Sequence, residues 1–425
     1  MLYSHITLKG GTRMNKFKFI DLFSGIGGFH QAMENLGGEC VFASEIDEFA
    51  IQTYKKNYGI DCAHDITKTK EEDIPKHDVL CAGFPCQTFS KAGQQLGFAD
   101  KTKGTLFFEI IRILKYHKTP YIILENVKNL TSHDDGKTWN IIKNALKEIG
   151  YIISEEPFII SPHQLGIPQL RERVVILGVH KDTGIKKLNV TLPNQDKKTI
   201  NFLNSGIIEN GEVDKKYFIS KHQEKVLQCW EEFIHGIKFI PSRRTDRTTK
   251  EKTYVKLDFN GTIGFPIWAF EFNETYDYSN EQYEWKKDFI AKNRYLYQYN
   301  KKFIDSWIKK WNIFEEFTPT EQKLEWQCGS ECDSIWEGLI QFRPSGVRVK
   351  TATVFPALVA MVQIPIIGKV KRRLTPREAA RLQNFPDDFI INENDHQAYK
   401  QFGNAVNVKV IQYMAEQLFK QNKKN

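Results

Sequence analysis

The first 180 residues alternate short, mostly apolar runs with stretches in which apolar residues recur at helical spacing. The apolar runs end in polar or glycine-rich positions, which is typical of buried strands. Strands are predicted at 17–23, 39–46, 77–84, 121–127 and 173–180. Helices are predicted between them at 29–37, 47–59, 104–118 and about 138–149. Strands separated by helices predict a parallel, doubly wound sheet that binds its ligands at the carboxyl ends of the strands.

The pattern changes near residue 181. From there to about 343 the chain is rich in Lys, Asn, Trp, Tyr and Phe, and its periodicity is poor. This composition predicts a second, smaller and irregular domain, entered through the polar linker 186–199. Helical patterning returns with a Thr-Pro helix start at 375–376 and continues to the chain end. The predicted parts are an N-terminal extension at 1–16, then 17–180, 181–343 and 344–425.

Composition changes this picture only slightly. The chain has 41% hydrophobic and 26% charged residues, as in ordinary globular proteins, and no apolar run near the ~20 residues that span a bilayer. No signal peptide is evident, and the seven cysteines show no disulfide rhythm, so we expect a reducing cytoplasm. No zinc set is completed near Cys328 and Cys332, and no metal is expected. The net charge of +8 suits a polyanionic partner, although a general lysine bias explains it equally well.

A glycine-rich turn follows the first predicted strand. In DLFSGIGGF the glycines are Gly25, Gly27 and Gly28, and a strand, such a turn and a helix together can cradle a nucleotide-like ligand. The spacing differs from G-x-G-x-x-G, so the dinucleotide fingerprint fails. Glu45 ends the second strand, where an acid can accept hydrogen bonds from both ribose hydroxyls. Asp65, expected near the end of a third short strand, can meet an amine of the same ligand.

Cys86 follows Pro85 at the end of another predicted strand, in GFPCQTFSKAGQQLGF. A thiol at the ligand-binding edge is well placed as a nucleophile, whereas most single cysteines are buried and inert. Cys40 and Cys81 lie inside apolar runs and fit that inert role better. The glycines of the following loop are typical of a segment that closes over a substrate.

Two further polar features belong to the same predicted edge. Glu125 ends the run YIILENV, and a partly desolvated carboxyl there can have a raised pKa and hydrogen-bond a ring nitrogen. Arg171 and Arg173 in QLRER are two residues apart on an extended run and are therefore predicted to share a face. Two guanidinium groups on one face can hold a carbonyl oxygen, a phosphate or Glu125, although an exposed arginine pair without function is the simpler alternative.

Taken together, these motifs resemble those of the C5 cytosine-specific DNA methyltransferases of bacterial restriction-modification systems. Six motifs occur in the order found in that family, and they cover residues 17–180 and 345–418. They are DLFSGIGGF, GFPCQTFS, ENV, QLRER, RRLTPREAARLQNFP and QFGNAVNVKV. The resemblance implies an α/β fold with a Rossmann-like, S-adenosylmethionine-dependent methyltransferase sheet, helices on both of its faces, and a catalytic domain completed by 344–425.

The resemblance also implies S-adenosylmethionine as cofactor, with S-adenosylhomocysteine as product. Phe23 is expected to stack on the adenine, Glu45 to bind the ribose, and Asp65 with Ile66 to meet the adenine edge. Asn404 lies in the last motif, so the chain end is expected to pack beside the first strand. The residues matched to cofactor binding are Phe23, Gly25, Gly27, Gly28, Glu45, Ile46, Asp65, Ile66, Pro85, Leu106 and Asn404.

The implied mechanism gives Cys86 the role of a nucleophile that adds to C6 of a cytosine extruded from the duplex. Glu125 is expected to hold N3, Arg173 to hold O2 and Arg171 to orient the site. The base that removes the C5 proton is not identified by any motif.

Residues 181–343 correspond to the region in which family members differ most, so the candidates for DNA contact rest on side-chain chemistry. Arginine bidentate to guanine is the commonest specific base contact, yet these residues can equally touch only phosphates or nothing. The aromatic residues of GFPIWAFEF are predicted to be core. The candidates are Gln87 and Ser90 beside Cys86, Arg243, Arg244 and Arg247 in SRRTDRTTKEK, and Arg343 and Arg348.

Double-stranded DNA is the expected partner, with a cognate restriction endonuclease acting at the same site without a stable complex, and a monomer suffices for the chemistry. A tRNA cytosine methyltransferase is the alternative of the same class, and the fairly long 181–343 region argues against it. A DNA-binding protein with a degenerate methylase fold is a second alternative, and the intact Cys86, Glu125, Arg171 and Arg173 argue against that. A nicotinamide-dependent oxidoreductase is a third, disfavoured by the glycine spacing.

Overall fold

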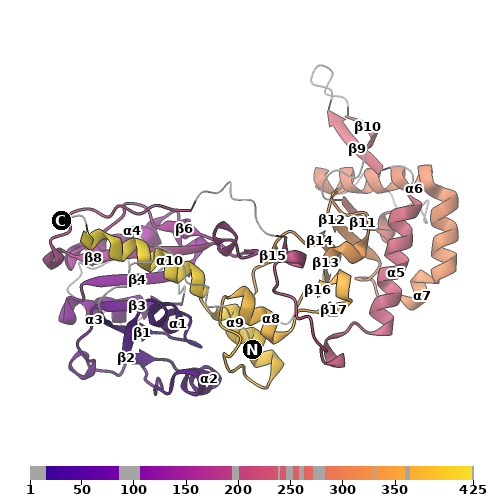
Figure 1. Ribbon diagram of the computed structural model, residues 1–425. Coiled ribbons are helices and arrows are strands. Elements are labelled where there is room, and N and C mark those ends of the chain that lie inside the picture. Colours follow the sequence, from indigo (N-terminus) through magenta and orange to yellow (C-terminus); the bar gives the residue numbers. More distant parts are fainter. Residues whose placement is uncertain are drawn as a thin grey trace. The chain divides into compact units, whose positions relative to one another are not determined.

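The computed structural model divides the chain into two compact units, and each is described here by itself (Figure 1). Unit 1 comprises 1–207, 356–361 and 376–425, and unit 2 comprises 208–355 and 362–375. The structure describes residues 16–85, 106–193, 201–237, 240–245, 252–257, 263–270, 283–329, 331–358 and 364–423.

The sheet of unit 1 has seven strands in the order β2-β1-β3-β4-β8-β5, with β6 also paired to β8. Strands β1 to β4 run parallel, whereas β8 is antiparallel to β4, β5 and β6. The strands are β1 (Phe17–Leu22), β2 (Gly38–Ser44), β3 (Val79–Gly83), β4 (Tyr121–Val127), β5 (Tyr151–Ile153), β6 (Phe158–Ile160) and β8 (Arg173–His180). The sheet is therefore mixed rather than wholly parallel. The link from β6 to β8 contains no α-helix, and a link without a helical crossover suits an antiparallel pair.

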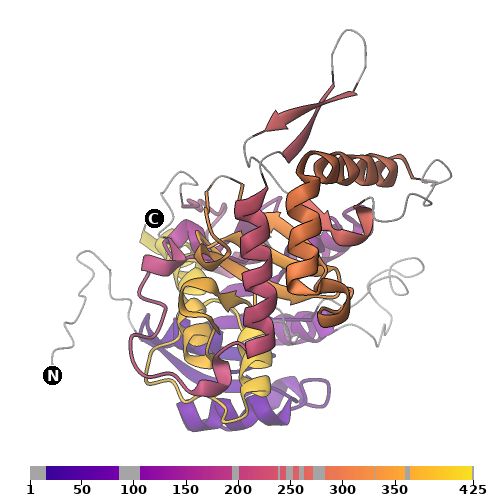
Figure 2. The same ribbon diagram turned by 90° about the vertical axis from the view of Figure 1, so that its right-hand side faces the viewer.

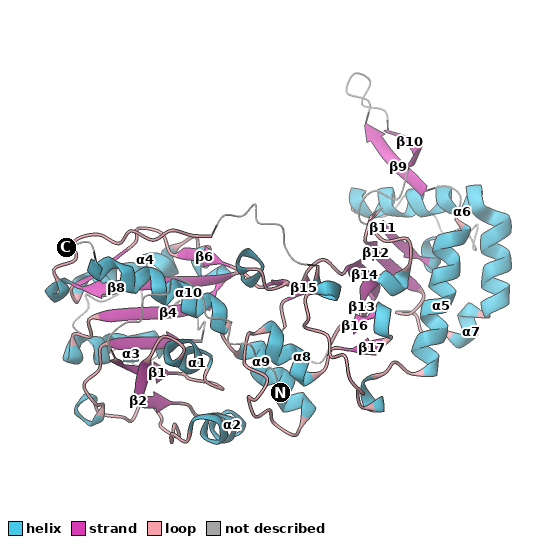
Figure 3. Cartoon of the chain, viewed as in Figure 1, coloured by secondary structure: helices cyan, strands magenta, loops and turns pink. Residues whose placement is uncertain are grey.

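Helices cover both faces of this sheet, as predicted (Figures 1 and 3). The first face is apolar at alternate strand positions, such as Leu22, Ala82 and Leu124, and packs against α3 and α4. On the other face the ring of Phe419 in α10 lies 5.1 Å from that of Phe17, and His30 in α1 lies 5.4 Å from Phe19. The helices are α1 (Gly28–Glu34), α2 (Glu48–Tyr58), α3 (Leu106–His117), α4 (Lys137–Glu148), α8 (Pro376–Leu382), α9 (Asp395–Asn404) and α10 (Val408–Phe419). The chain end thus packs beside the first strand.

Local sequence signals account for most of these boundaries. Asp47 caps α2, where its carboxylate accepts from the Ala50 N–H at 3.0 Å, and Gly59 ends the helix in a left-handed conformation. Asn407 caps α10 in the same way through the Val410 N–H. The third short strand expected near Asp65 does not form: residues 59–65 are irregular and the next strand is β3.

Unit 2 contains a six-stranded sheet in the order β11-β12-β14-β13-β16-β17 and a separate hairpin. Only β12 and β14 are parallel. The sheet strands are β11 (Ile263–Pro266), β12 (Lys323–Gln327), β13 (Gly338–Arg343), β14 (Gly346–Thr351), β16 (Ile366–Ile367) and β17 (Arg372–Arg373), and the hairpin pairs β9 (Ile240–Thr245) with β10 (Lys252–Leu257). Weak periodicity therefore underestimated the regular structure of this unit. The boundaries between the compact units lie at 207/208 and 355/356, whereas the sequence analysis divided the chain at 181 and 344. The second boundary follows β14 because that strand pairs within the sheet of unit 2.

Helices α5 (Lys221–Gly236), α6 (Glu284–Trp311) and α7 (Ile313–Glu316) complete unit 2, with α5 and α6 packed together (Figure 2). Their shared core contains the fully buried rings of Trp230, Phe233, Trp307 and Trp326. Such large rings supply much of the apolar burial of a small domain.

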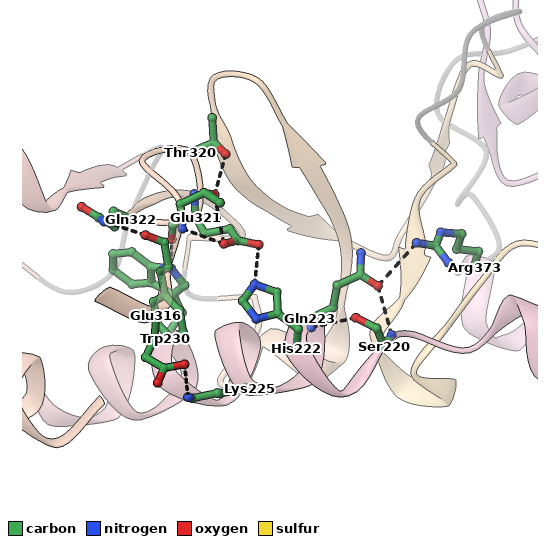
Figure 4. Close-up of polar contacts among 12 residues, drawn as sticks. Ser220, His222, Gln223, Lys225, Trp230, Glu316, Thr320, Glu321, Gln322 and Arg373 are labelled. Carbon is green, nitrogen blue, oxygen red and sulfur yellow. Dashed lines mark hydrogen bonds and ion pairs between the residues drawn. The ribbon is translucent and has the colours of Figure 1, made fainter. Parts of the chain in front are cut away.

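Polar contacts fix the start of α5 (Figure 4). Ser220 and Gln223 form a reciprocal capping box, which satisfies two otherwise unpaired backbone N–H groups. Glu321 accepts from His222 at 3.0 Å, and its backbone carbonyl accepts from the indole of Trp230 at 2.8 Å. The helix is thereby joined to the segment that enters β12.

Candidate functional site

The carboxyl ends of β1 to β4 meet at one edge of the unit 1 sheet, and among the described site residues Glu45, Glu125 and Arg173 lie at this edge. Gly83 of β3 lies opposite Glu125 of β4, and Arg173 at the start of antiparallel β8 lies opposite Val127. The strand ends from which a ligand-binding edge was predicted thus lie next to one another in the sheet.

The glycine turn after β1 is tied to the end of β2 by Glu45. One oxygen of this carboxylate, Oε2, accepts from the Gly25 N–H at 2.8 Å. The other, Oε1, accepts from the N–H groups of Ile46 at 2.7 Å and Asp47 at 2.9 Å. A carboxylate offers about four acceptor positions, so roughly one remains for a ligand hydroxyl rather than the expected two.

The three glycines of the turn serve different purposes. Gly25 has φ +55°, and a Cβ there would meet nothing within 4 Å, so the backbone faces open space. A Cβ on Gly27 would lie 2.2 Å from the ring of Tyr58, and one on Gly28 would lie 2.7 Å from Val406. Close packing therefore requires Gly27 and Gly28, whereas Gly25 is the position that leaves room for a ligand.

Apolar side chains flank this open space. Ile46, beside Glu45, is 72% exposed, and Phe23 is partly buried with a left-handed backbone at φ 56°. A left-handed phenylalanine is unfavourable by itself and occurs where surrounding structure holds it. An exposed isoleucine beside a ring and a carboxylate suits an adenosine group, which has an apolar ring face and polar hydroxyls. The residues present thus fit the cofactor that the sequence implied.

The remaining predicted cofactor residues are distributed unevenly around the edge. Asp65 is half-exposed and engaged locally: it accepts from Thr67 and pairs with Lys68 at 3.0 Å, and the Thr67 hydroxyl and Lys68 lower its pKa. The side chain of Ile66 is buried in the core, so only its backbone can meet a ligand. Pro85 and Asn404 are exposed, and Leu106 begins α3 half-buried.

Glu125 and Arg173 form an ion pair at this edge, with Nε of Arg173 3.1 Å from Oε1 of Glu125. Burial raises the pKa of Glu125, and the positive charges of Arg173 and Arg171 only partly oppose that shift. A carboxyl held in this way keeps its proton to a higher pH than an ordinary glutamic acid. Its neutral form, which can donate a hydrogen bond, is therefore more favoured than that of an ordinary glutamic acid.

Arg171 has a different environment from Arg173. It is almost fully buried, and its Nη atoms donate to the carbonyls of Leu358 at 3.0 Å and of Gly403 and Ala405 at 2.9 Å each. Burial lowers its pKa to about 9, which leaves the group charged at neutral pH. The two arginines therefore have different contacts: Arg171 ties the returning chain on both sides of Asn404 to the sheet edge, while Arg173 pairs with Glu125.

Two residues of the edge escaped the sequence analysis. Asn126, 2% exposed, donates from Nδ2 to the carbonyl of Phe84 at 2.9 Å and so holds the turn that carries Pro85. Ser161 accepts the backbone N–H of Arg171 at 2.9 Å. The motif ENV contained a signal for Asn126, since an amide directly after a strand-end acid is well placed to bind the neighbouring chain.

Comparison with known proteins identifies the family of the chain. A family model described as C-5 cytosine-specific DNA methylase matches residues 17–420. The chain is 35% identical to the Type II methyltransferase M.HpaII of Haemophilus parainfluenzae, over 93% of this chain and 87% of that protein. It is 31% identical to M.AluI of Cellulosimicrobium cellulans, over 94% and 91% of the two chains. The chain belongs to the C-5 cytosine-specific DNA methylase family.

Solved structures agree with this methylase at the level of the fold. A putative DNA modification methyltransferase from an Escherichia coli prophage has a TM-score of 0.56 at 20% identity, covering 96% of this chain and 100% of that one. A Spodoptera frugiperda DNMT2 mutant has a TM-score of 0.52 at 21% identity, covering 95% and 99%. The fold is that of S-adenosylmethionine-dependent methyltransferases, and the family implies that cofactor for this DNA methylase.

The predicted DNA-contact residues of the methylase are only partly described. Cys86, Gln87, Ser90 and Arg247 lie outside the described residues. Arg243 and Arg244 are consecutive positions of β9. Arg343 is the last residue of β13 and Arg348 lies in β14, so both belong to the sheet of unit 2. Arg348 pairs with Glu325, Nε to Oε2 at 2.6 Å.

Two general features complete the description. Within the described part of the chain, no helix is both long and apolar enough to cross a membrane. In the same residues, no group of three or more histidine, cysteine, aspartate or glutamate side chains could hold a metal ion.

Proposed function

We propose that this methylase modifies C5 of a cytosine held outside the duplex, with Cys86 as the nucleophile. The observation that carries the proposal is the Glu125–Arg173 pair, because it brings a carboxyl with a raised pKa and a guanidinium together at the edge of the sheet at which β3 ends, shortly before Pro85. Cytosine offers N3 and O2 as two adjacent polar atoms. One carboxyl and one guanidinium are the complementary pair for them.

In the proposed reaction the Cys86 thiolate adds to C6 and makes C5 a carbon nucleophile. Glu125 donates a hydrogen bond to N3 and thereby stabilises the negative charge that the addition places on the ring. Arg173 holds O2. Once C5 carries the transferred methyl group, a base removes the C5 proton. The C5–C6 double bond then re-forms and Cys86 leaves as thiolate. All of this requires an unstacked base, and extrusion costs a few kcal/mol that contacts with the protein must offset.

S-adenosylmethionine, when bound, supplies an electrophilic methyl group. Glu45 is proposed to accept from a ribose hydroxyl with its remaining acceptor position, and Phe23 and Ile46 to contact the adenine. Asp65 and the backbone of Ile66 are proposed to meet the adenine edge. Pro85, Leu106 and Asn404 are proposed to complete the pocket. Support comes from the open space at Gly25, and from the hold of Arg171 on the segment that carries Asn404.

Unit 2 is proposed as the part that recognises a short duplex site, with 376–425 completing the catalytic unit. The curated relatives are named as Type II methyltransferases, which supports a restriction-modification role and a cognate endonuclease acting on the same site. We further propose that the protein acts as a monomer in the cytoplasm. The proposed DNA contacts remain Gln87, Ser90, Arg243, Arg244, Arg247 and Arg343. Arg348 is also a proposed contact, although its guanidinium already pairs with Glu325.

The experiment is bisulfite sequencing of a plasmid incubated with the protein and S-adenosylmethionine. Protected cytosines at one recurring short sequence are expected, and they would identify the site as well as the reaction. If only a parallel tRNA substrate accepts the methyl group, the substrate is RNA. If neither is modified, a DNA-binding role without turnover is the better description.

A further inference from the structure

Unit 2 contains a cavity that the proposed reaction does not use. It lies between strands β11 and β12, the 3₁₀ turn η7 (Ile267–Ala269) and the beginning of α6, and its volume is about 420 Å³. That size falls within the range of sites that bind small ligands, about 300–1,000 Å³. The lining combines aromatic rings with charged and polar groups: Trp268, Phe289, Lys292, Lys323, Glu325 and Ser345.

One aromatic residue that lines the cavity, Trp268, is much more exposed than its neighbours in the chain. Phe265 and Phe270 are buried, as the sequence predicted for the aromatic residues of this stretch, but the prediction is wrong for Trp268, which is 50% exposed. The short turn η7 directs it outward. Its ring lies 6.2 Å from that of Phe289, at 43°. A half-exposed indole beside a cavity offers a flat apolar surface on which another planar ring can stack.

The charges around the cavity favour an anion. Glu325 is the one carboxylate among the lining residues, and it is taken by Arg348, whose Nη2 lies 2.5 Å from Oε2. Burial would raise the pKa of Glu325, but hydrogen bonds from Arg348 and Ser345 outweigh it and the pKa is lowered, so the acid is ionised and neutralised by its partner. Lys323, for which no ion pair forms within the described part of the chain, then leaves a positive charge on the lining.

A planar ring joined to an anionic group matches both walls. We propose that this cavity binds one unstacked nucleotide of the DNA, with its base against Trp268 and its phosphate near Lys323. The choice of DNA as the source rests on the proposed function. The site is separate from the place proposed for the target cytosine in unit 1. Stacking on an aromatic side chain tolerates any base, so such a site would hold a displaced base without reading its sequence.

The test compares two duplexes of the same sequence, one fully paired and one with a single extra unpaired thymidine, in fluorescence-anisotropy binding without S-adenosylmethionine. The wild-type protein is expected to bind the bulged duplex about ten-fold more tightly, the size of one base–aromatic stack. Trp268→Leu should abolish that preference and leave binding of the paired duplex unchanged. Lys323→Gln should reduce the slope of log affinity against log salt by about one.

Helix α6 offers a matched control for each of the two substitutions. Trp285 is 67% exposed on α6 without lining the cavity, and Lys309 is exposed in the last turn of that helix. Trp285→Leu and Lys309→Gln should behave as wild type. Thermal melts of all variants check folding. Equal affinity of the wild type for both duplexes, or a preference that survives Trp268→Leu, overturns the proposal.

A third arm separates sources of the ligand. If thymidine monophosphate binds in a Trp268-dependent way but the bulged duplex has no advantage, the ligand is a free nucleotide and the assignment to DNA is overturned. Because none of these measurements involves methyl transfer, failure of the proposed reaction in the bisulfite assay and failure of this nucleotide site are independent results.

Discussion

The sheet edge of unit 1 and the cavity of unit 2 use charged groups in opposite ways. At the edge, Glu45 is held by three backbone N–H groups, Arg171 by three carbonyls, and Glu125 by Arg173. At the cavity, the single lining carboxylate is neutralised and a half-exposed indole lines the same cavity as Lys323. The first arrangement is already organised before any ligand binds, whereas the second leaves aromatic surface and positive charge for a partner.

This difference follows from what each region must do. A catalytic edge needs fixed dipoles, because reorganising them during the reaction would add to the barrier. A recognition surface needs groups that contact a partner only in the complex. The comparison predicts that substitutions at the edge affect rate or folding strongly, while those in unit 2 affect affinity and site selection.

The largest effect is expected for Cys86→Ala. Loss of the nucleophile should lower methyl transfer at least about a thousand-fold, because no other group can form the covalent bond to C6. Radiolabelled methyl transfer and equilibrium binding of S-adenosylmethionine measure the two properties, and binding should change less than about two-fold. Cys40→Ala is the control, since burial raises the pKa of that thiol to about 12. Equal activity of the Cys86 variant removes it from the mechanism.

Glu125→Gln should lower the rate about a hundred-fold and also change its pH dependence. The pKa of Glu125 is raised, so the proton is present at low pH and is lost as the pH rises through that pKa. The wild-type rate should therefore show an alkaline decrease that the glutamine variant lacks, because an amide does not titrate. Single-turnover rates between pH 6 and about 10 measure both profiles. Identical alkaline limbs would exclude Glu125 as the donor to N3.

Arg171→Met and Arg173→Gln should separate the two roles that the contacts of these arginines indicate. Without Arg171 three buried carbonyls lose a charged donor, so unfolding should become easier by about 3 kcal/mol or more, with weaker S-adenosylmethionine binding. Without Arg173 the rate should fall while stability and cofactor affinity stay near wild type. Urea unfolding and calorimetric binding provide the readouts. The comparison fails if the Arg171 variant is as stable as the Arg173 variant.

A smaller effect is expected in unit 2 when Arg243→Ala and Arg244→Ala are combined. One lost base contact is worth about 1–3 kcal/mol. Affinity for the target duplex should therefore fall roughly ten-fold, or discrimination against altered duplex sequences should weaken. Competition between cognate and altered duplexes measures it, and cofactor binding serves as the control. Unchanged affinity and selectivity would exclude the hairpin β9–β10 from the DNA interface.

The smallest effect concerns Asp21, which lies in β1 beneath the glycine turn. Its carboxyl is fully buried, and burial raises its pKa well above the ordinary 3.8, although the backbone N–H of His30 opposes part of that shift. The folded state favours the neutral form of Asp21. Its contribution to the free energy of unfolding is therefore complete below pH 3.8 and is lost as the pH rises through the raised pKa. Urea unfolding at pH 5 and 8 should show a smaller loss for Asp21→Asn than for wild type, by about 1 kcal/mol. Asp388→Asn, on the surface, is the control and should keep the wild-type slope.

Much of unit 1 could be predicted because its signals are local. The apolar runs that became β1, β2, β3, β4 and β8, and caps such as Asp47, are readable from neighbouring residues alone. The strand near Asp65 was the exception, because a few apolar residues without a paired neighbour do not make a strand. In unit 2, β12 pairs with β14 and β13 with β16 across irregular connections, so periodicity within any one segment carried little information.

The sequence by itself determined the family, the parallel core of the sheet and which residues meet at its edge, because ordered motifs and strand ends are properties of short segments. Only the tertiary structure decided what each charge does. Arg171 and Arg173 are two residues apart, yet one donates to carbonyls more than 180 residues away in the chain and the other pairs with Glu125. It also decided that Trp268 faces a cavity while its neighbours are core. Burial and partnership arise from contacts between distant segments, and these set the pKa and the free energy of every group in the site.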